Sequence, residues 1–276
     1  MKRILLLTDF SDSAMNAVHY TLQFFETQEC TFYLMNVHKA GTFISDDLVM
    51  ASNQSIYDSL TKKPKENLEL IVSEITNRYQ NKKHHFETII DFDVFTDAVN
   101  QAIKVNDIDL VVIGSNGATG AKEIIFGSNT LNVIRNVLCK TLVVPNGYTY
   151  KAISNFLLPL QVDDDFHENQ LKTVHDFVEN YDLNFHILRV CNSAEAEKHT
   201  KFDLTHLENY NCTYSVEKHK SFYDAVIHYI EANTIDMTGL IVHDKGFIKR
   251  LLTESPAVEL SKVIILPLMI FHSLNN

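Results

Sequence analysis

The chain has 276 residues, which is enough for two domains of ordinary size, each with its own hydrophobic core. Apolar residues make up 45% and charged residues 21%, with only 5 Pro and 8 Gly, a composition typical of globular protein and not of long disordered segments. The formal net charge of −11 and the absence of a dense Lys and Arg cluster argue against nucleic acids and anionic membranes as partners.

The first half of the chain alternates apolar runs with amphipathic stretches. Residues 4–7 form an apolar run without alternation, which predicts a strand buried on both faces. Apolar residues then recur at helical spacing behind Ser11 and Ser13, either of which can be the N-cap. Four further strands are predicted at residues 31–37, 85–90, 109–113 and 141–144, and three further helices at 66–79, starting after Pro64, at 97–105 and at 129–137. This order predicts a doubly wound, five-stranded parallel sheet of the α/β class.

The same order begins again after a short connector at residues 147–150. FYLMNV at 32–37 matches FHILRV at 185–190, and Asp-Ala-Val at 97–99 matches Asp-Ala-Val at 224–226. The final LVVP of the first copy is matched with IILP at 264–267. Internal similarity of this kind predicts two tandem copies of one fold, which we place at residues 1–148 and 151–276.

The cysteines and the first residues bear on where the protein resides. The four cysteines are scattered without a CxxC pair, which is typical of reduced thiols in the cytosol. The apolar run at residues 4–7 is too short for a signal peptide, and no run reaches the roughly 18 residues that span a membrane. We therefore expect a cytoplasmic protein.

A glycine-rich segment separates the fourth strand from the fourth helix of the first copy. It reads Gly114-Ser115-Asn116-Gly117, then nine residues, then Gly127-Ser128. Gly114 and Gly117 allow positive φ and a close approach of backbone N–H groups to an anion, and a helix that opens at Ser128 offers unpaired amides. The hydroxyls of Ser128 and Thr130 can add donors to phosphate oxygens. The alternative is that the glycines only shape a βα turn and that Ser128 caps a helix.

With this motif the whole chain resembles the universal stress protein family, whose nucleotide-binding members carry G-x-x-G, nine residues, then G-[ST]. The resemblance implies an adenine nucleotide alpha hydrolase-like fold with ATP as ligand, with or without Mg²⁺. It also implies that Asp9 contacts the ribose, that main-chain atoms of Val37 hold the adenine edge, and that Ile113 lines the pocket. The alternatives are that Asp9 caps the first helix and that Val37 is ordinary core. The implied nucleotide-binding set is Asp9, Val37, Ile113, Gly114, Gly117, Gly127, Ser128, Asn129 and Thr130.

The second copy departs from this motif. Alignment of residues 240–242 with 111–113 places His243 at the first glycine and Glu254 near the missing Gly-Ser pair, while Gln161 replaces Asp9. The His243 side chain would crowd a phosphate, and the carboxylate of Glu254 would repel it. We therefore expect no nucleotide in the second copy.

Three functions are compatible with these features. The first is a regulatory ATP-binding protein that acts in stress responses through an unknown protein partner and hydrolyses ATP slowly at most. The second is an adenine-nucleotide hydrolase-type enzyme, although the chain has no GxSxG elbow, Walker lysine or zinc-site spacing. The third is a scaffold that binds no nucleotide. The histidines fit no metal-site pattern, so we expect solvated polar surface there.

The family resemblance further implies contacts beyond the nucleotide. It predicts that residues 142–144 lie antiparallel to residues 264–266, which makes the two copies an intramolecular pseudo-dimer and leaves a homodimer of whole chains open. Residues 38–63 form a polar insert in the first copy, and we expect it to cover the nucleotide or a partner site.

Overall fold

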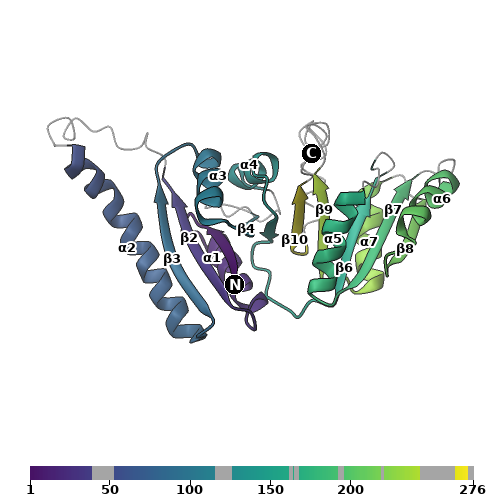
Figure 1. The fold of residues 1–276 in the computed structure, drawn as a ribbon, viewed down its shortest axis with the longest axis horizontal. Coiled ribbons are helices and arrows are strands. Elements are labelled where there is room, and N and C mark those ends of the chain that lie inside the picture. Colours follow the sequence, from purple (N-terminus) through teal and green to yellow (C-terminus); the bar gives the residue numbers. More distant parts are fainter. Residues whose placement is uncertain are drawn as a thin grey trace. The chain divides into compact units, whose positions relative to one another are not determined.

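The computed structural model describes residues 1–38, 53–115, 126–161, 164, 168–191, 196–218, 221–242 and 265–272. The chain divides into two compact units and passes from one to the other between Gly147 and Tyr148. Each unit is a sheet with helices packed against it (Figure 1). Among the described residues, no helix combines the length and apolar character that a membrane span needs.

The first unit has the predicted alternation of strands and helices. Its strands are ordered β3-β2-β1-β4-β5, and their described pairings are parallel. Right-handed crossovers place α1 and α2 on one face and α3 and α4 on the other. The elements are β1 (Lys2–Leu7), α1 (Asp12–Phe24), β2 (Cys30–Val37), α2 (Asn53–Tyr79), β3 (His84–Asp91), α3 (Phe95–Asn106), β4 (Leu110–Gly114), α4 (Ser128–Asn136) and β5 (Thr141–Val144).

Side-chain contacts support these two helical layers. His19 of α1 lies 3.1 Å from the Tyr79 hydroxyl of α2, and Asn100 of α3 donates to the main-chain carbonyl of Asn136 in α4. The central strands are buried on both faces, as their unbroken apolar runs predict. Ser11 is the N-cap of α1, and its hydroxyl accepts from the Ala14 amide at 3.3 Å.

The second helix differs from its prediction. α2 begins at Asn53 and contains Pro64, whereas the sequence pattern places its start after Pro64. A proline inside a helix removes one backbone hydrogen bond and costs about 3 kcal/mol. Pro64, Leu68 and Ile75 are all buried against the unit, and this packing offsets the cost. The predicted insert at residues 38–63 is therefore partly helix, and its residues 39–52 lie outside the described part of the chain.

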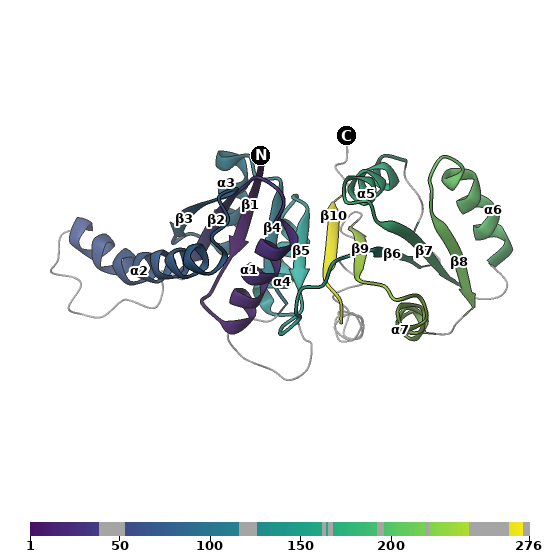
Figure 2. The same ribbon diagram turned by 90° about the horizontal axis from the view of Figure 1, so that it is seen from below.

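The second unit repeats the first. Its strand order is β10-β9-β6-β7-β8 with parallel described pairings, so the predicted α/β class with two tandem five-stranded sheets is confirmed (Figure 2). The elements are β6 (Asn155–Leu160), α5 (Glu168–Asn180), β7 (Asn184–Cys191), α6 (Ala196–Leu207), β8 (Thr213–Lys218), α7 (Phe222–Asn233), β9 (Met237–Val242) and β10 (Leu268–His272).

The final strand of the second unit lies later in the chain than predicted. Ile265 and Leu266 form a turn, and β10 follows Pro267, whose carbonyl accepts from the Thr238 amide at 3.0 Å. A proline is tolerated just before a strand because it need not donate to the ladder there. The apolar run Leu268–His272 then pairs with β9. The prediction paired residues 264–266 with residues 142–144 as strands; residues 265 and 266 are not part of a strand, and residue 264 lies outside the described residues.

Candidate functional site

The predicted site residues gather at the carboxyl ends of three neighbouring strands. Asp9 follows β1, Val37 ends β2, and Ile113 and Gly114 end β4. The chain runs from β1 to β2 on one side and later returns to β4 on the other side, so β1 and β4 flank the switch point of the sheet. Ligands of doubly wound sheets bind at such points. Gly117 lies outside the described residues.

Asp9 belongs to a tight turn between β1 and α1. Phe10 has a φ of 65°, and its amide donates to the Thr8 hydroxyl at 3.0 Å. The exposed Asp9 carboxylate accepts from the Ser11 amide at 3.1 Å through Oδ1. Because Ser11 is the N-cap, Asp9 is not the cap of α1. The turn instead fixes a carboxylate at the mouth of the crevice.

Val37 presents main-chain atoms to the same crevice. The ladder between β1 and β2 ends at Leu7 and Met35, where the Met35 carbonyl accepts from the Thr8 amide at 2.9 Å. Alternate residues of a strand direct their backbone groups to the same side. The backbone groups of Val37, two residues after Met35, therefore point to the β1 side, beyond the end of β1.

Gly114 is a glycine for a reason that the motif does not show. Gly114 does not use the positive φ that a glycine allows, since among the described glycines only Gly147 has one. A Cβ at Gly114 would lie 2.6 Å from the Ser13 hydroxyl and 2.8 Å from the Ser13 carbonyl oxygen. The first turn of α1 thus packs directly on the backbone of β4.

The start of α4 is tied to the end of β4 by hydrogen bonds. The Gly127 amide donates to the Ser115 carbonyl at 2.8 Å, and the buried Thr130 hydroxyl lies 2.9 Å from the Gly114 carbonyl. The hydroxyl proton of Thr130 is therefore engaged within the protein. Thr130 can offer a ligand its backbone amide, but not the hydroxyl donor that the sequence suggested. Ser128 and Asn129 are exposed. Gly127 provides no side-chain cap for the first amides of α4, and uncapped helix amides are groups to which an anion can bind.

Two buried polar atoms at this site were not predicted. The Ser13 hydroxyl is buried beside Gly114, and the Asn36 Oδ1 is buried next to Val37. Neither atom has a hydrogen-bond partner among the described residues. The one signal in the sequence is Asn36 itself, a polar residue within the apolar run of β2. Buried polar groups are normally satisfied, so both atoms point to a partner outside the described residues.

The equivalent place in the second unit is filled by the protein's own charges. Arg189 of β7 is fully buried, and its Nε and Nη2 donate to the two carboxylate oxygens of Asp203 in α6, each at 2.8 Å. Its Nη1 donates to the carbonyls of Gln161 and, at 2.7 Å, of Asp164. The Tyr214 hydroxyl of β8 donates to Asp203 at 2.6 Å. The cluster joins the end of β6 to three other elements.

The Arg189 cluster changes the acidity of its members. Burial on its own would lower the pKa of Arg189, but the hydrogen bonds and charge of Asp203 outweigh this, so the pKa is raised. Burial and then the hydrogen bond to Asp203 raise the pKa of Tyr214. The guanidinium therefore stays charged and the phenol stays protonated at neutral pH. Residues 243 and 254, which the sequence implicates here, lie outside the described residues.

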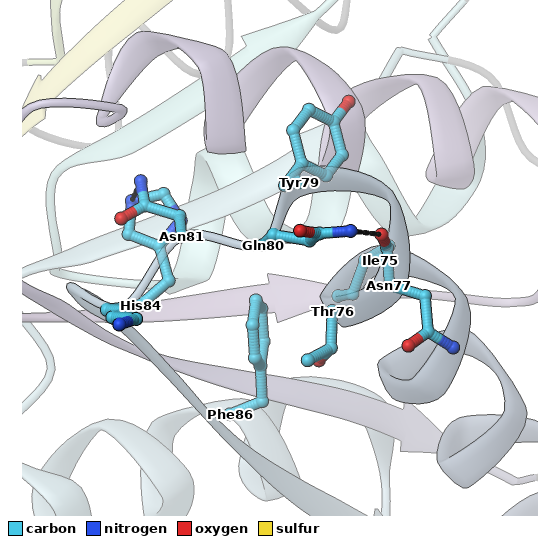
Figure 3. A pocket seen from close by; sticks show the side chains of 9 residues that line it. Ile75, Thr76, Asn77, Tyr79, Gln80, Asn81, His84 and Phe86 are labelled. Atoms are coloured by element: carbon cyan, nitrogen blue, oxygen red, sulfur yellow. Dashed lines mark hydrogen bonds between the residues drawn. The ribbon is translucent and has the colours of Figure 1, made fainter.

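A groove of about 420 Å³ lies elsewhere on the first unit (Figure 3). It is lined by the end of α2 and the start of β3, including Tyr79, Gln80 and Phe86. Gln80 is held there by a hydrogen bond from its side chain to the Asn77 carbonyl at 3.3 Å. Because β3 begins at His84, this groove is at the amino ends of the strands and contains none of the predicted site residues.

The strand order, with its switch point between β1 and β4, defines the first unit as a doubly wound α/β domain. Residues 1–145 match the Universal stress protein family. This match covers more than half of the chain, so the protein belongs to the universal stress protein family. No curated protein matches the chain.

Solved structures share the fold. A universal stress protein from Archaeoglobus fulgidus DSM 4304 is 15% identical, with 98% of each chain covered and a TM-score of 0.71. The cytoplasmic domain of a prokaryotic cation chloride cotransporter is 11% identical, with 98% of this chain and 94% of that one covered and a TM-score of 0.52. A universal stress protein family protein from Arabidopsis thaliana with AMP bound is 17% identical, with 53% of this chain and 93% of that one covered and a TM-score of 0.38.

Proposed function

We propose that the first domain, residues 1–148, binds ATP and that its occupancy regulates a protein partner in the cytoplasm during stress. The observation that carries this proposal is the open start of α4 beside the end of β4, within a member of the universal stress protein family. Helix amides and the positive end of the helix dipole attract phosphates even in a protein with a net charge of −11.

Each part of the nucleotide has a proposed contact. The Asp9 carboxylate suits the vicinal hydroxyls of the ribose, and the backbone groups of Val37 suit the adenine edge. Ile113, which is buried at the end of β4, would line the pocket. Amides from Ser128 to Thr130 would bind the phosphates, with Gly114 and Gly117 shaping the turn and Ser128 adding its hydroxyl. A Mg²⁺ ion bound to the phosphates would reduce their charge.

We propose that the second domain, residues 151–276, binds no nucleotide. The Arg189 guanidinium occupies the position that corresponds to Asn36. In the second unit Leu160 pairs with Arg189. In the first unit, the register of β1 and β2 continued by one residue brings Thr8, the counterpart of Leu160, to Asn36. A nucleotide would have to displace Arg189 and Asp203 from each other, and separating a buried ion pair is unfavourable. The second domain would then serve as the partner-facing or structural half of the chain.

Calorimetric titration of the purified, nucleotide-free chain with ATP tests the proposal. We expect one ATP per chain and a much weaker response from Asp9→Ala and Gly117→Val. Asp12→Ala is the matched control, because Asp12 is an exposed acid in the adjoining first turn of α1 and should leave affinity unchanged.

The nucleotide recovered after several hours distinguishes the remaining functions. Unchanged ATP supports a regulatory role, whereas rapid cleavage at the α-phosphate would support a hydrolase-type enzyme. If the wild-type chain binds no ATP, the protein is a scaffold and the proposal is wrong. If Asp9→Ala and Gly117→Val fold and bind ATP as well as the wild type, the residue assignment is wrong.

A further inference from the structure

The side-chain amide of Asn36 is fixed in one orientation at the end of β2. Its Nδ2 donates to the Thr8 carbonyl at 2.8 Å, and only the nitrogen end of an amide can make this bond. The residue is 4% exposed, so the amide cannot turn toward bulk water. Its oxygen, Oδ1, therefore faces away from Thr8 as a fixed acceptor.

This acceptor has no donor among the described residues. A buried amide oxygen without a donor is unfavourable, and native proteins keep few of them. The second unit shows that the position can be satisfied internally, because Arg189 there makes hydrogen bonds through Nε, Nη1 and Nη2. In the described part of the first unit, the corresponding acceptor has no donor, and it lies one residue before Val37.

We propose that Asn36 Oδ1 accepts a hydrogen bond from the 6-amino group of the bound base and so selects adenine over other purines. This inference rests on the proposed function. Val37 would contact the base edge through its backbone, and the neighbouring Asn36 supplies the acceptor that an amino group needs. Hypoxanthine and guanine carry a carbonyl at this position, which would set two acceptors against each other.

The fixed orientation is what makes the selection effective. An unconstrained asparagine can turn its amide to donate to a carbonyl and so accommodate either base. Turning Asn36 would place its oxygen against the Thr8 carbonyl and lose the bond at 2.8 Å. A site whose buried polar group is left unpaired by the wrong ligand discriminates strongly.

Titration of the full chain with ATP and with ITP tests the inference, since the two bases differ in the 6-substituent, an amino group or a carbonyl, and in the proton that hypoxanthine carries at N1. We expect the wild type to bind ATP at least about tenfold more tightly than ITP. Asn36→Leu should lose affinity for ATP but not for ITP, so that the preference falls. Asn16→Leu is the control, because Asn16 also ties its amide to a main-chain carbonyl, that of Pro145, at 3.1 Å.

The outcomes separate this inference from the proposed function. If the wild type binds neither nucleotide, the proposed function and the inference are both wrong. If it binds ATP and ITP equally, or if folded Asn36→Leu keeps the wild-type preference, only the inference is wrong. Asn36→Ser, which is smaller and lacks the amide oxygen, replaces the leucine variant if the latter does not fold, and it should lower the preference in the same way.

Discussion

Replacement of Asp203 by alanine should destabilise the second domain strongly. The side chain of Asp203 is fully buried, and that of Arg189 is 1% exposed. Removal of the carboxylate leaves a buried cation whose Nε and Nη2 have lost their acceptor, and it also removes the acceptor of the Tyr214 hydroxyl. The two carbonyls on Nη1 remain, but they cannot neutralise the charge.

The size of this effect follows from the burial of the pair. Breaking a fully buried ion pair by removing one partner costs about 3–5 kcal/mol. For a domain of this size each kcal/mol lowers the melting temperature by roughly 3 °C, so we expect a fall of about 10–15 °C. Removing both charges together is different, because replacement of a buried pair by apolar groups is often neutral or stabilising. Arg189→Met with Asp203→Leu should therefore melt near the wild type.

Differential scanning calorimetry of the whole chain is the assay, because the two domains can melt in separate transitions. ATP should raise only the transition of the first domain, which identifies the other one. Asp176→Ala is the matched control, since Asp176 is an exposed aspartate on α5 of the same unit. A loss of less than about 1 kcal/mol in the unfolding free energy of Asp203→Ala would refute the reasoning, because an exposed ion pair contributes no more than that.

Three further predictions concern single residues. The pKa of Tyr214 is raised above its ordinary value of 10.0, so the hydrogen bond to Asp203 stabilises the fold below pH 10 and is lost as the pH rises above it. The fall in melting temperature at alkaline pH should therefore be smaller in Tyr214→Phe than in the wild type. Burial lowers the pKa of His272 to about 4, so its neutral form stabilises the fold above pH 6.5, and up to about 3 kcal/mol should be lost on acidification toward pH 4. Urea unfolding at both pH values should show a smaller loss in His272→Phe. Gly114→Ala should lower the free energy of unfolding by about 1–3 kcal/mol in the absence of nucleotide. Adding Ser13→Ala should not restore stability, because the contact of the new Cβ with the residue 13 carbonyl oxygen at 2.8 Å remains. Thermal melting of the nucleotide-free chain measures both effects.

The strands and most helices could be predicted because local patterns determine them. Apolar runs marked β1 and β4, and of the two candidate N-caps of α1, Ser11 and Ser13, the structure uses Ser11. Local rules failed where packing outweighed them. Pro64 normally precedes or breaks a helix, but its burial on one face of α2 allows the helix to continue. The fifth strand of the second copy was misplaced because the apolar residues before Pro267 resemble those before Pro145 in the first copy and were matched with them. The longer apolar run after Pro267 forms the strand instead.

The candidate site could be predicted in position but not in detail. The glycine-rich segment drew attention to Gly114, and the family resemblance selected Asp9 and Val37. All three lie at one edge of the sheet, since parallel strands end together. Spacing did not show that Gly114 contacts Ser13, which lies about a hundred residues away, or that Thr130 uses its hydroxyl internally. The partnership of Arg189 with Asp203 was also hidden, because it depends on how α6 packs on the sheet.

The contrast between Asn36 and Arg189 explains one advantage of joining two copies in one polypeptide. A symmetric dimer of identical chains must carry the same residue at both equivalent positions, so both of its crevices are open or both are closed. Duplication within one chain lets each position evolve separately. Under the proposed function, a single chain with one nucleotide site would respond to its ligand with a hyperbolic saturation curve.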